Sequence, residues 1–151
     1  VVMFNDTLAA NVALGDAHPS PRLIEQALQA AHLGDYLATL PLGIHTVVGH
    51  NAAQLSGGQR QLVHITRALL RDPTIWLMDE PTASMDATLE TKVIGMLHNE
   101  LAVNPKSTLI LVTHKPQLLS LVNRIVILVN QQVIMDGPRD IILQKLQKMQ
   151  Y

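Results

Sequence analysis

The stretch TIWLMDEP, residues 74–81, is a compact apolar run that ends on two acidic residues and a proline. A second run of the same kind, STLILVTH, follows at residues 107–114. Short aliphatic runs between polar or breaker residues are typical of buried parallel strands. Between the two runs, apolar residues recur near helical spacing at Leu89, Val93, Met96, Leu97 and Leu101. The order strand, crossover helix, parallel strand predicts a βαβ unit, and with it an α/β fold.

Composition agrees with this fold class. Of the 151 residues, 48% are hydrophobic, 15% are charged and only 3% are aromatic, so the apolar mass is aliphatic, as in buried parallel strands and the helices packed on them. The net charge of −1 and the lack of a basic cluster make nucleic acid an unexpected partner. Without cysteine, disulfides, thiolate metal ligands and cysteine nucleophiles are excluded. No apolar run approaches the roughly 20 residues of a membrane-spanning helix.

Residues 5–54 are predicted to form short helices. In SPRLIEQALQAAHLG, residues 20–34, Ser20 is the candidate N-cap, Pro21 takes the first helical position and Gly34 ends the helix. Its apolar stripe is expected at Leu23, Ala27, Leu28 and Ala31. A further short helix is predicted in DYLATLP, residues 35–41.

Two elements are predicted after the βαβ unit. The segment RIVILVNQQVIMDG, residues 124–137, alternates through a polar break and indicates a hairpin or two sheet-edge strands. The segment RDIILQKLQKMQ, residues 139–150, is predicted to be a helix with Ile142, Leu146 and Met149 on one face.

The segment SGGQ, residues 56–59, carries the first chemical signal. Ser56 and Gln59 fit a capping box, so a helix containing Leu62 and Ile65 is expected to begin at Ser56. The next two residues, Gly57 and Gly58, then lie in its first turn, where glycine costs about 1 kcal/mol against alanine. Bare N–H groups at a helix N-terminus form an anion site, and an ordinary Gly-Gly turn before a capped helix is the alternative.

The ends of the two predicted strands carry the second signal. Asp79 and Glu80 end the first strand and His114 ends the second, and ligands of open α/β sheets bind at such carboxyl ends. Consecutive strand residues point to different sides, so Asp79 could hold Mg²⁺ while Glu80 polarises a water for attack on a phosphoryl group. The alternative is that both acids solvate the strand end and that His114 is structural. The other histidines show no metal-ligand spacing.

The segments LSGGQRQ, IWLMDEPTASMD and LILVTH, in this order and at these separations, resemble the signature motif, Walker B and D-loop, and switch histidine of ATP-binding-cassette (ABC) ATPases. The resemblance is greatest to exporter cassettes, including bacterial type I secretion and peptide exporters. It implies one partial ABC ATPase domain with a P-loop NTPase (RecA-like) parallel sheet. Its expected parts are a helical subdomain over about 5–54, the signature loop and helix over 55–71, and the C-terminal part of the catalytic core over 72–151.

The resemblance also implies roles for individual residues. The signature, formed by Leu55, Ser56, Gly57, Gly58 and Gln59, would contact the γ-phosphate of an ATP held by a second cassette in a head-to-tail dimer. Asp79 would serve the magnesium ion, Glu80 would be the general base and His114 would sense the γ-phosphate. Asp86 would be the D-loop acid at the dimer seam.

Some family features differ or lie outside the sequence. Exporters usually carry T-x-V-G-E-x-G before the signature, and here TVVGHNA has His50 for the glutamate and Ala52 for the glycine. The family would place the Walker A lysine and the Q-loop glutamine upstream of Val1. Because phosphate cradling by the Walker A segment supplies much of the nucleotide affinity, this fragment alone is expected to bind ATP weakly and not to turn it over.

The expected function is that of an ATP-binding and ATP-hydrolysing subunit that powers export, with ATP and Mg²⁺ as cofactors. The expected partners are a second cassette and the transmembrane domain of an exporter, at the cytoplasmic face of the membrane. Two alternatives remain open: a non-transport ABC ATPase that acts on DNA or the ribosome, and a degenerate cassette that does not hydrolyse ATP.

Overall fold

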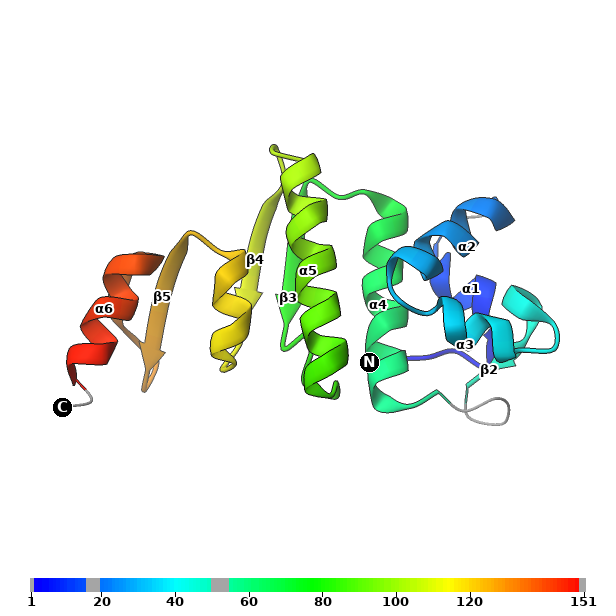
Figure 1. Ribbon diagram of the computed structural model, residues 1–151, viewed down its shortest axis with the longest axis horizontal. Helices are drawn as coiled ribbons and strands as arrows, with labels where there is room; N and C mark the ends of the chain where they lie inside the picture. Colours follow the sequence, from blue (N-terminus) through cyan, green and yellow to red (C-terminus); the bar gives the residue numbers. More distant parts are fainter. Residues whose placement is uncertain (1, 16–19, 50–54, 150–151) are drawn as a thin grey trace.

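The computed structural model describes residues 2–15, 20–49 and 55–149. The elements follow one another along the long axis of the molecule, as Figure 1 shows. Short helices lie at one end, two long helices and a strand pair occupy the middle, and a hairpin with the last helix lies at the other end (Figure 1). His50 and Ala52, where the sequence departs from the exporter pattern, lie outside the described residues.

The elements have the following bounds. The helices are α1 (Leu8–Val12), α2 (Pro21–Ala30), α3 (Gly34–Thr39), α4 (Gly57–Arg71), α5 (Ala87–Val103) and α6 (Arg139–Met149), with short 3₁₀ helices η1 (Gly43–His45) and η2 (Pro116–Leu121). The strands are β1 (Asp6–Thr7), β2 (Val47–Val48), β3 (Ile75–Asp79), β4 (Thr108–Val112), β5 (Arg124–Val129) and β6 (Gln132–Pro138). None of the described helices is long and apolar enough to cross a membrane.

The predicted βαβ unit is confirmed. β3 and β4 pair in parallel, with Ile75 opposite Thr108 and Asp79 opposite Val112, and α5 is the crossover helix between them. Trp76 on β3 packs in one buried cluster with Val93 and Leu97 of α5. The two strands therefore end at the same edge, with Asp79 the last residue of β3.

The helix predicted over residues 20–34 is partly wrong. It ends at Ala30, and Gly34 instead begins α3, which confirms the short helix predicted next to it. Ser20 holds the N-cap position, but its side chain makes no capping hydrogen bond. Ala27, Leu28 and Ala31 are buried as predicted, but Leu23 is 55% exposed and Ile24 takes its place in the buried stripe.

A short antiparallel ribbon that the sequence did not predict closes the N-terminal part. β1 pairs with β2 over two residues, with Asp6 opposite Val48. The buried Asn11 stabilises this end, because its amide donates to the carbonyl groups of Phe4 and Thr7 and its oxygen accepts from the Phe4 N–H. Two-residue strands are too short for an alternating pattern, so hydrogen bonds formed in the tertiary structure define them.

The C-terminal part confirms the predicted hairpin and helix. β5 and β6 are antiparallel, with a register shift between Ile127 and Leu128, and they form a sheet separate from β3 and β4 in the described chain. α6 packs on the hairpin through Ile142, which is 1% exposed and lies against Gly137.

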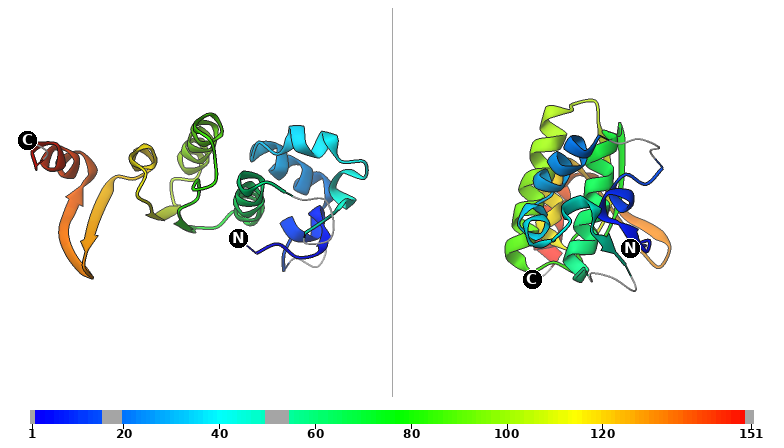
Figure 2. Two further views of the ribbon diagram at one scale, coloured as in Figure 1. Left: turned by 90° about the horizontal axis from the view of Figure 1, so that it is seen from below. Right: turned by 90° about the vertical axis from the view of Figure 1, so that its right-hand side faces the viewer.

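Only one face of the β3–β4 pair is covered in the described chain. In the left view of Figure 2 the crossover helix α5 lies above the β3–β4 pair, and no described element lies below the pair. On the uncovered face, Ile75, Leu77, Ile110 and Val112 are each more than half exposed. They share this face because Leu77 is paired with Ile110 and side chains alternate along each strand.

Candidate active-site edge at Glu80 and His114

Glu80 lies at the sharp turn after β3. Its backbone is left-handed, with φ of 44°, a conformation that costs a residue with a side chain about 1 kcal/mol or more. The turn is held because the Glu80 N–H donates to the Val112 carbonyl over 2.9 Å and the Glu80 carbonyl accepts from the Ala83 N–H. Pairing with β4 thus continues one residue past the strand and directs the Glu80 side chain to the sheet edge.

His114 and Thr113 follow β4 and contact the Glu80 carboxylate. His114 lies two residues beyond Val112, so it follows the strand rather than ending it as predicted. Its backbone N–H donates to Glu80 Oε1 over 2.9 Å, and its Nδ1 lies 2.6 Å from the same oxygen. The Thr113 hydroxyl donates to Glu80 Oε2 over 3.2 Å. The expected proximity of Glu80 and His114 is therefore present.

These contacts set the ionisation of Glu80. Partial desolvation raises the pKa of the carboxyl, but the hydrogen bonds and charge of His114 and the hydrogen bond of Thr113 outweigh it, so the pKa lies below its ordinary value. An ionised carboxylate only accepts hydrogen bonds, so Nδ1 of His114 must carry the hydrogen that lies between them. The site thus holds an anionic carboxylate, with the other ring nitrogen of an 80% exposed imidazole facing away from this contact.

Asp79 is exposed at the same edge, and no hydrogen bond reaches its carboxylate within the described residues. Across those residues no group of three or more histidine or acidic side chains forms a metal site. Mg²⁺ in nucleotide sites is usually held by one or two carboxylates together with substrate phosphates and water. A single accessible carboxylate fits that mode of binding.

The capping box at the start of α4 is confirmed. The Ser56 hydroxyl accepts from the Gln59 N–H over 3.1 Å, and the Gln59 side chain accepts from the Ser56 N–H over 2.8 Å. These two bonds leave the N–H groups of Gly57 and Gly58 without an acceptor in the described chain. Such N–H groups at the positive end of a helix dipole are suited to an anion.

A close neighbour within the chain also explains why residues 57 and 58 are glycine. A Cβ added to Gly57 would lie 2.9 Å from the Cβ of Ser84, and one added to Gly58 would lie 3.2 Å from the Ser84 carbonyl oxygen. The turn after Glu80 therefore packs directly on the first turn of α4. Within the described chain, Ser84 would thus be the nearest neighbour of a side chain at either position.

Asp86 is the N-cap of α5, where its carboxylate accepts from the Leu89 N–H over 2.8 Å. Its predicted place at a dimer seam remains a prediction. One turn later, Glu90 is 8% exposed and accepts from the Lys115 ammonium over 2.7 Å and from the Thr82 hydroxyl. Lys115 also donates to the Thr82 carbonyl over 2.9 Å.

This polar cluster of the buried Thr82 and Glu90 with the half-buried Lys115 was missed by sequence reasoning. It connects the loop after Glu80 to the loop that carries His114, because Lys115 follows His114 directly. Its signals in the sequence were the position of Lys115 and the acid four residues after Asp86. Neither residue has a spacing that singles out its partner.

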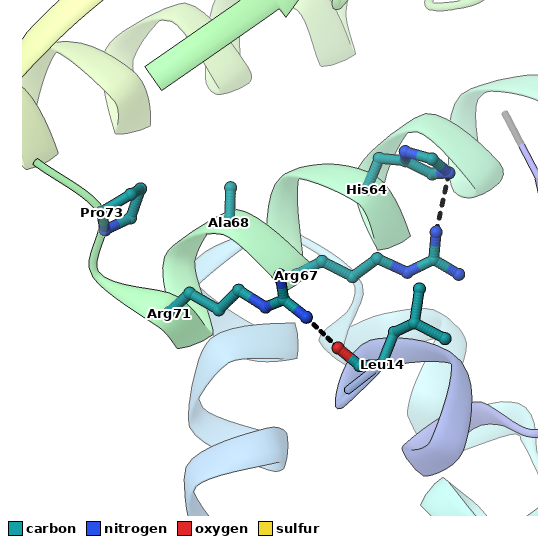
Figure 3. Close-up of a pocket in the computed structure, with 6 residues that line it drawn as sticks. All are labelled: Leu14, His64, Arg67, Ala68, Arg71 and Pro73. Carbon is teal, nitrogen blue, oxygen red and sulfur yellow. Dashed lines mark hydrogen bonds between the residues drawn. The ribbon is translucent and has the colours of Figure 1, made fainter. Parts of the chain in front are cut away.

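A separate pocket of about 280 Å³ lies between α4 and α1, lined by Leu14, His64, Arg67, Ala68, Arg71 and Pro73 (Figure 3). Its two arginines form hydrogen bonds with carbonyl groups at the C-terminal end of α1. Arg67 donates to the Asn11 carbonyl and Arg71 donates to the Leu14 carbonyl. Burial, together with the charge of Arg67, lowers the pKa of His64. The neutral ring can therefore accept from Arg67 over 2.9 Å (Figure 3). These contacts attach α1 to α4.

A family model described as ABC transporter matches residues 4–83, just over half of the chain. The chain belongs to the ABC transporter family. The resemblance in the motifs is thus confirmed, and so is the expected α/β fold of the P-loop NTPase class, including a parallel sheet.

Two relatives are named as a flippase and as a multidrug efflux protein. The ATP-dependent lipid A-core flippase of Burkholderia orbicola (strain AU 1054) is 38% identical over 144 residues, which are 95% of this chain and 24% of the flippase. A multidrug efflux ATP-binding/permease protein of Mycobacterium bovis (strain BCG / Pasteur 1173P2) is 35% identical over 139 residues, 92% of this chain and 11% of that protein.

The structure is also similar to a bacterial Atm1-family ABC exporter with ATP bound. The TM-score is 0.82 at 31% identity, and the match covers 95% of this chain and 25% of that one. The ABC cassette chain described here therefore spans about a quarter or less of the length of these proteins.

Proposed function

We propose that this chain is part of an ATP-hydrolysing cassette that powers export across a membrane. The observation that carries the proposal is the contact of His114 and Thr113 with an ionised Glu80 at the carboxyl edge of β3 and β4. Such an edge is where ligands of α/β sheets bind. Membership of the ABC family and relatives that are named as a flippase and an efflux protein support ATP-driven transport as the purpose of this chemistry.

At this edge Glu80 would accept the proton of the attacking water as general base. Its anionic form suits this task, and its left-handed backbone fixes where the carboxylate lies. His114 would hold that carboxylate through Nδ1 and offer its exposed ring to the γ-phosphate of ATP. Asp79 would be the protein ligand of Mg²⁺, which neutralises phosphate charge when bound.

The signature residues Leu55, Ser56, Gly57, Gly58 and Gln59 would contact a nucleotide held by a second cassette, through the N–H groups at the start of α4. Asp86 would lie at the seam between the two cassettes. In this proposal the helices before residue 55 contact a transmembrane domain, and the cassette works at the cytoplasmic face of the membrane. The exporter relatives favour this assignment over a non-transport ABC ATPase.

Substitution of Glu80 by glutamine in the full-length protein tests the proposal. Glu80→Gln removes the base but keeps the size of the side chain, so ATP turnover should fall by at least about 100-fold while ATP stays bound. Asp140→Asn is the control for an acid-to-amide change, because Asp140 is exposed on α6, and it should leave turnover unchanged. Turnover that survives Glu80→Gln would show that Glu80 is not the general base. A full-length protein that binds ATP without hydrolysing it would support a degenerate cassette instead.

The 151-residue chain alone is a separate case. We expect it to bind ATP more weakly than micromolar and to release no phosphate, because the family's Walker A lysine and Q-loop glutamine are not among its residues. Calorimetric titration with ATP and a phosphate-release assay on the isolated chain check this. Micromolar binding, or steady turnover that Glu80→Gln abolishes, would show that the 151 residues suffice without a Walker A lysine and a Q-loop glutamine.

A further inference from the structure

The Gln61 side chain bridges two points of the turn that carries Glu80. Its Nε2 donates to the Glu80 carbonyl over 3.2 Å, and its Oε1 accepts from the Ser84 N–H over 2.9 Å. Gln61 belongs to α4, whereas Glu80 and Ser84 lie between β3 and α5. One amide thus joins the signature helix to both ends of the segment 80–84.

The turn needs such support, because Glu80 has a left-handed backbone. An uncommon backbone conformation persists only where the surroundings fix it. The Glu80 N–H is held by β4, through Val112, while its carbonyl is held by the Ala83 N–H within the turn and by Gln61 from outside it. Gln61 is therefore the side chain that ties the carbonyl of this strained residue to another element of the described chain.

The same amide lies one turn along α4 from the glycines that pack on Ser84. A Cβ added at Gly57 or Gly58 would come within 3.2 Å of Ser84, so no side chain fits between the helix and Ser84, and Gln61 accepts from the Ser84 N–H. A shift of the first turn of α4 would therefore move Ser84, and through Gln61 it would move the Glu80 backbone. Gln61 thus connects the first turn of α4, where we propose that phosphate binds, to the sheet edge that carries Glu80.

We propose that Gln61 is a positioning residue for ATP hydrolysis that sets the Glu80 backbone according to the position of the signature helix. Gln61 touches no reacting atom and acts through the Glu80 carbonyl. The proposal rests on the assignment of Glu80 as the general base. The two hydrogen bonds of Gln61 can be tested separately. Gln61→Glu keeps the acceptor for the Ser84 N–H and loses the donor to the Glu80 carbonyl.

The test compares Gln61→Met, Gln61→Glu and the control Gln147→Met in the full-length protein. Gln147 is exposed on α6, at the far end of the molecule from α4 (Figure 1). Gln61→Met and Gln61→Glu should each lower kcat at least about tenfold, the effect of losing roughly one hydrogen bond at the base. The KM for ATP should stay within about twofold, and Gln147→Met should change neither constant. Wild-type kcat in either Gln61 variant, or an equal loss in the control, would overturn the proposal.

Amide hydrogen exchange tests the bridge without relying on turnover. Exchange at the Ser84 N–H should be faster in Gln61→Met and near wild type in Gln61→Glu, which keeps the acceptor. Unchanged exchange in Gln61→Met would show that the bridge does not hold the turn. If Glu80→Gln kept its turnover, the proposed function would fail, and the exchange result would still decide whether Gln61 fixes this segment.

Discussion

At the scale of single residues, Gly57 is required by a neighbour in its own chain. The added Cβ of Gly57→Ala would meet the Ser84 Cβ at 2.9 Å. Overpacking costs typically 1–3 kcal/mol, while the better helix propensity of alanine returns at most about 1 kcal/mol. We expect the free energy of unfolding to fall by about 1 kcal/mol, measured by chemical denaturation.

Removing the neighbour should reverse this effect. In a background that carries Ser84→Gly, the same Gly57→Ala change should cost less, so the two substitutions should couple in a double-mutant cycle. Additive effects would show that the loss comes from the backbone of α4 and not from Ser84.

The pair of Glu90 and Lys115 provides a second prediction at this scale. Lys115→Met leaves the buried Glu90 carboxylate without its cation and should cost about 3 kcal/mol of unfolding free energy. Lys106→Met, at an exposed position, is the control and should be near neutral. Thermal or denaturant unfolding of the three proteins measures this, and equal stability of all three would contradict it.

The same pair predicts a dependence on acid. Hydrogen bonds from Lys115 and Thr82, together with the Lys115 charge, hold the pKa of Glu90 below its ordinary value of 4.5 against the opposing effect of burial. A lowered carboxyl pKa adds stability to the fold that is present at a pH above this ordinary value. This stability is lost as the pH falls below about 4.5. Glu90→Gln should therefore narrow the difference between the unfolding free energies at neutral and acidic pH. A curve parallel to that of the unsubstituted protein would contradict this.

At the scale of elements, α2 and α4 begin alike in sequence but not in structure. Both have serine at the N-cap, but only Ser56 accepts a hydrogen bond within its helix. Ser56→Ala should cost about 1 kcal/mol of unfolding free energy, whereas Ser20→Ala should change it little. Denaturation of the two variants measures the contrast, and equal losses would show that Ser20 caps α2 in solution.

At the scale of the whole molecule, the uncovered face of the β3–β4 pair is the surface where we expect the chain to self-associate. This face is an exposed aliphatic surface made by Ile75, Leu77, Ile110 and Val112. Exposed apolar surfaces of this kind drive association. The 151-residue chain alone should therefore self-associate in sedimentation experiments. Leu77→Lys together with Ile110→Lys should reduce this, whereas Val103→Lys, on the equally exposed end of α5, should not.

Much of the fold was determined by the sequence alone. Two short aliphatic runs around an amphipathic segment were sufficient for the βαβ unit, because strand and helix periodicities are local properties of the chain. The capping box at Ser56 and the hairpin over β5 and β6 were predicted for the same reason. Glu80 and His114 could be placed at one edge because parallel strands end together.

The tertiary structure decided what depends on contacts between distant residues. Gly34 begins a helix instead of ending one, because the chain already leaves α2 at His32, whose backbone is left-handed with φ of 60°, and the Leu33 N–H bonds back to the Leu28 carbonyl. The bridge of Gln61 to Glu80 and Ser84 spans about twenty residues of sequence, and no local spacing predicts a partner at that distance. The residues proposed to carry the chemistry thus stood out in the sequence, whereas the side chains that contact them were defined only by the fold.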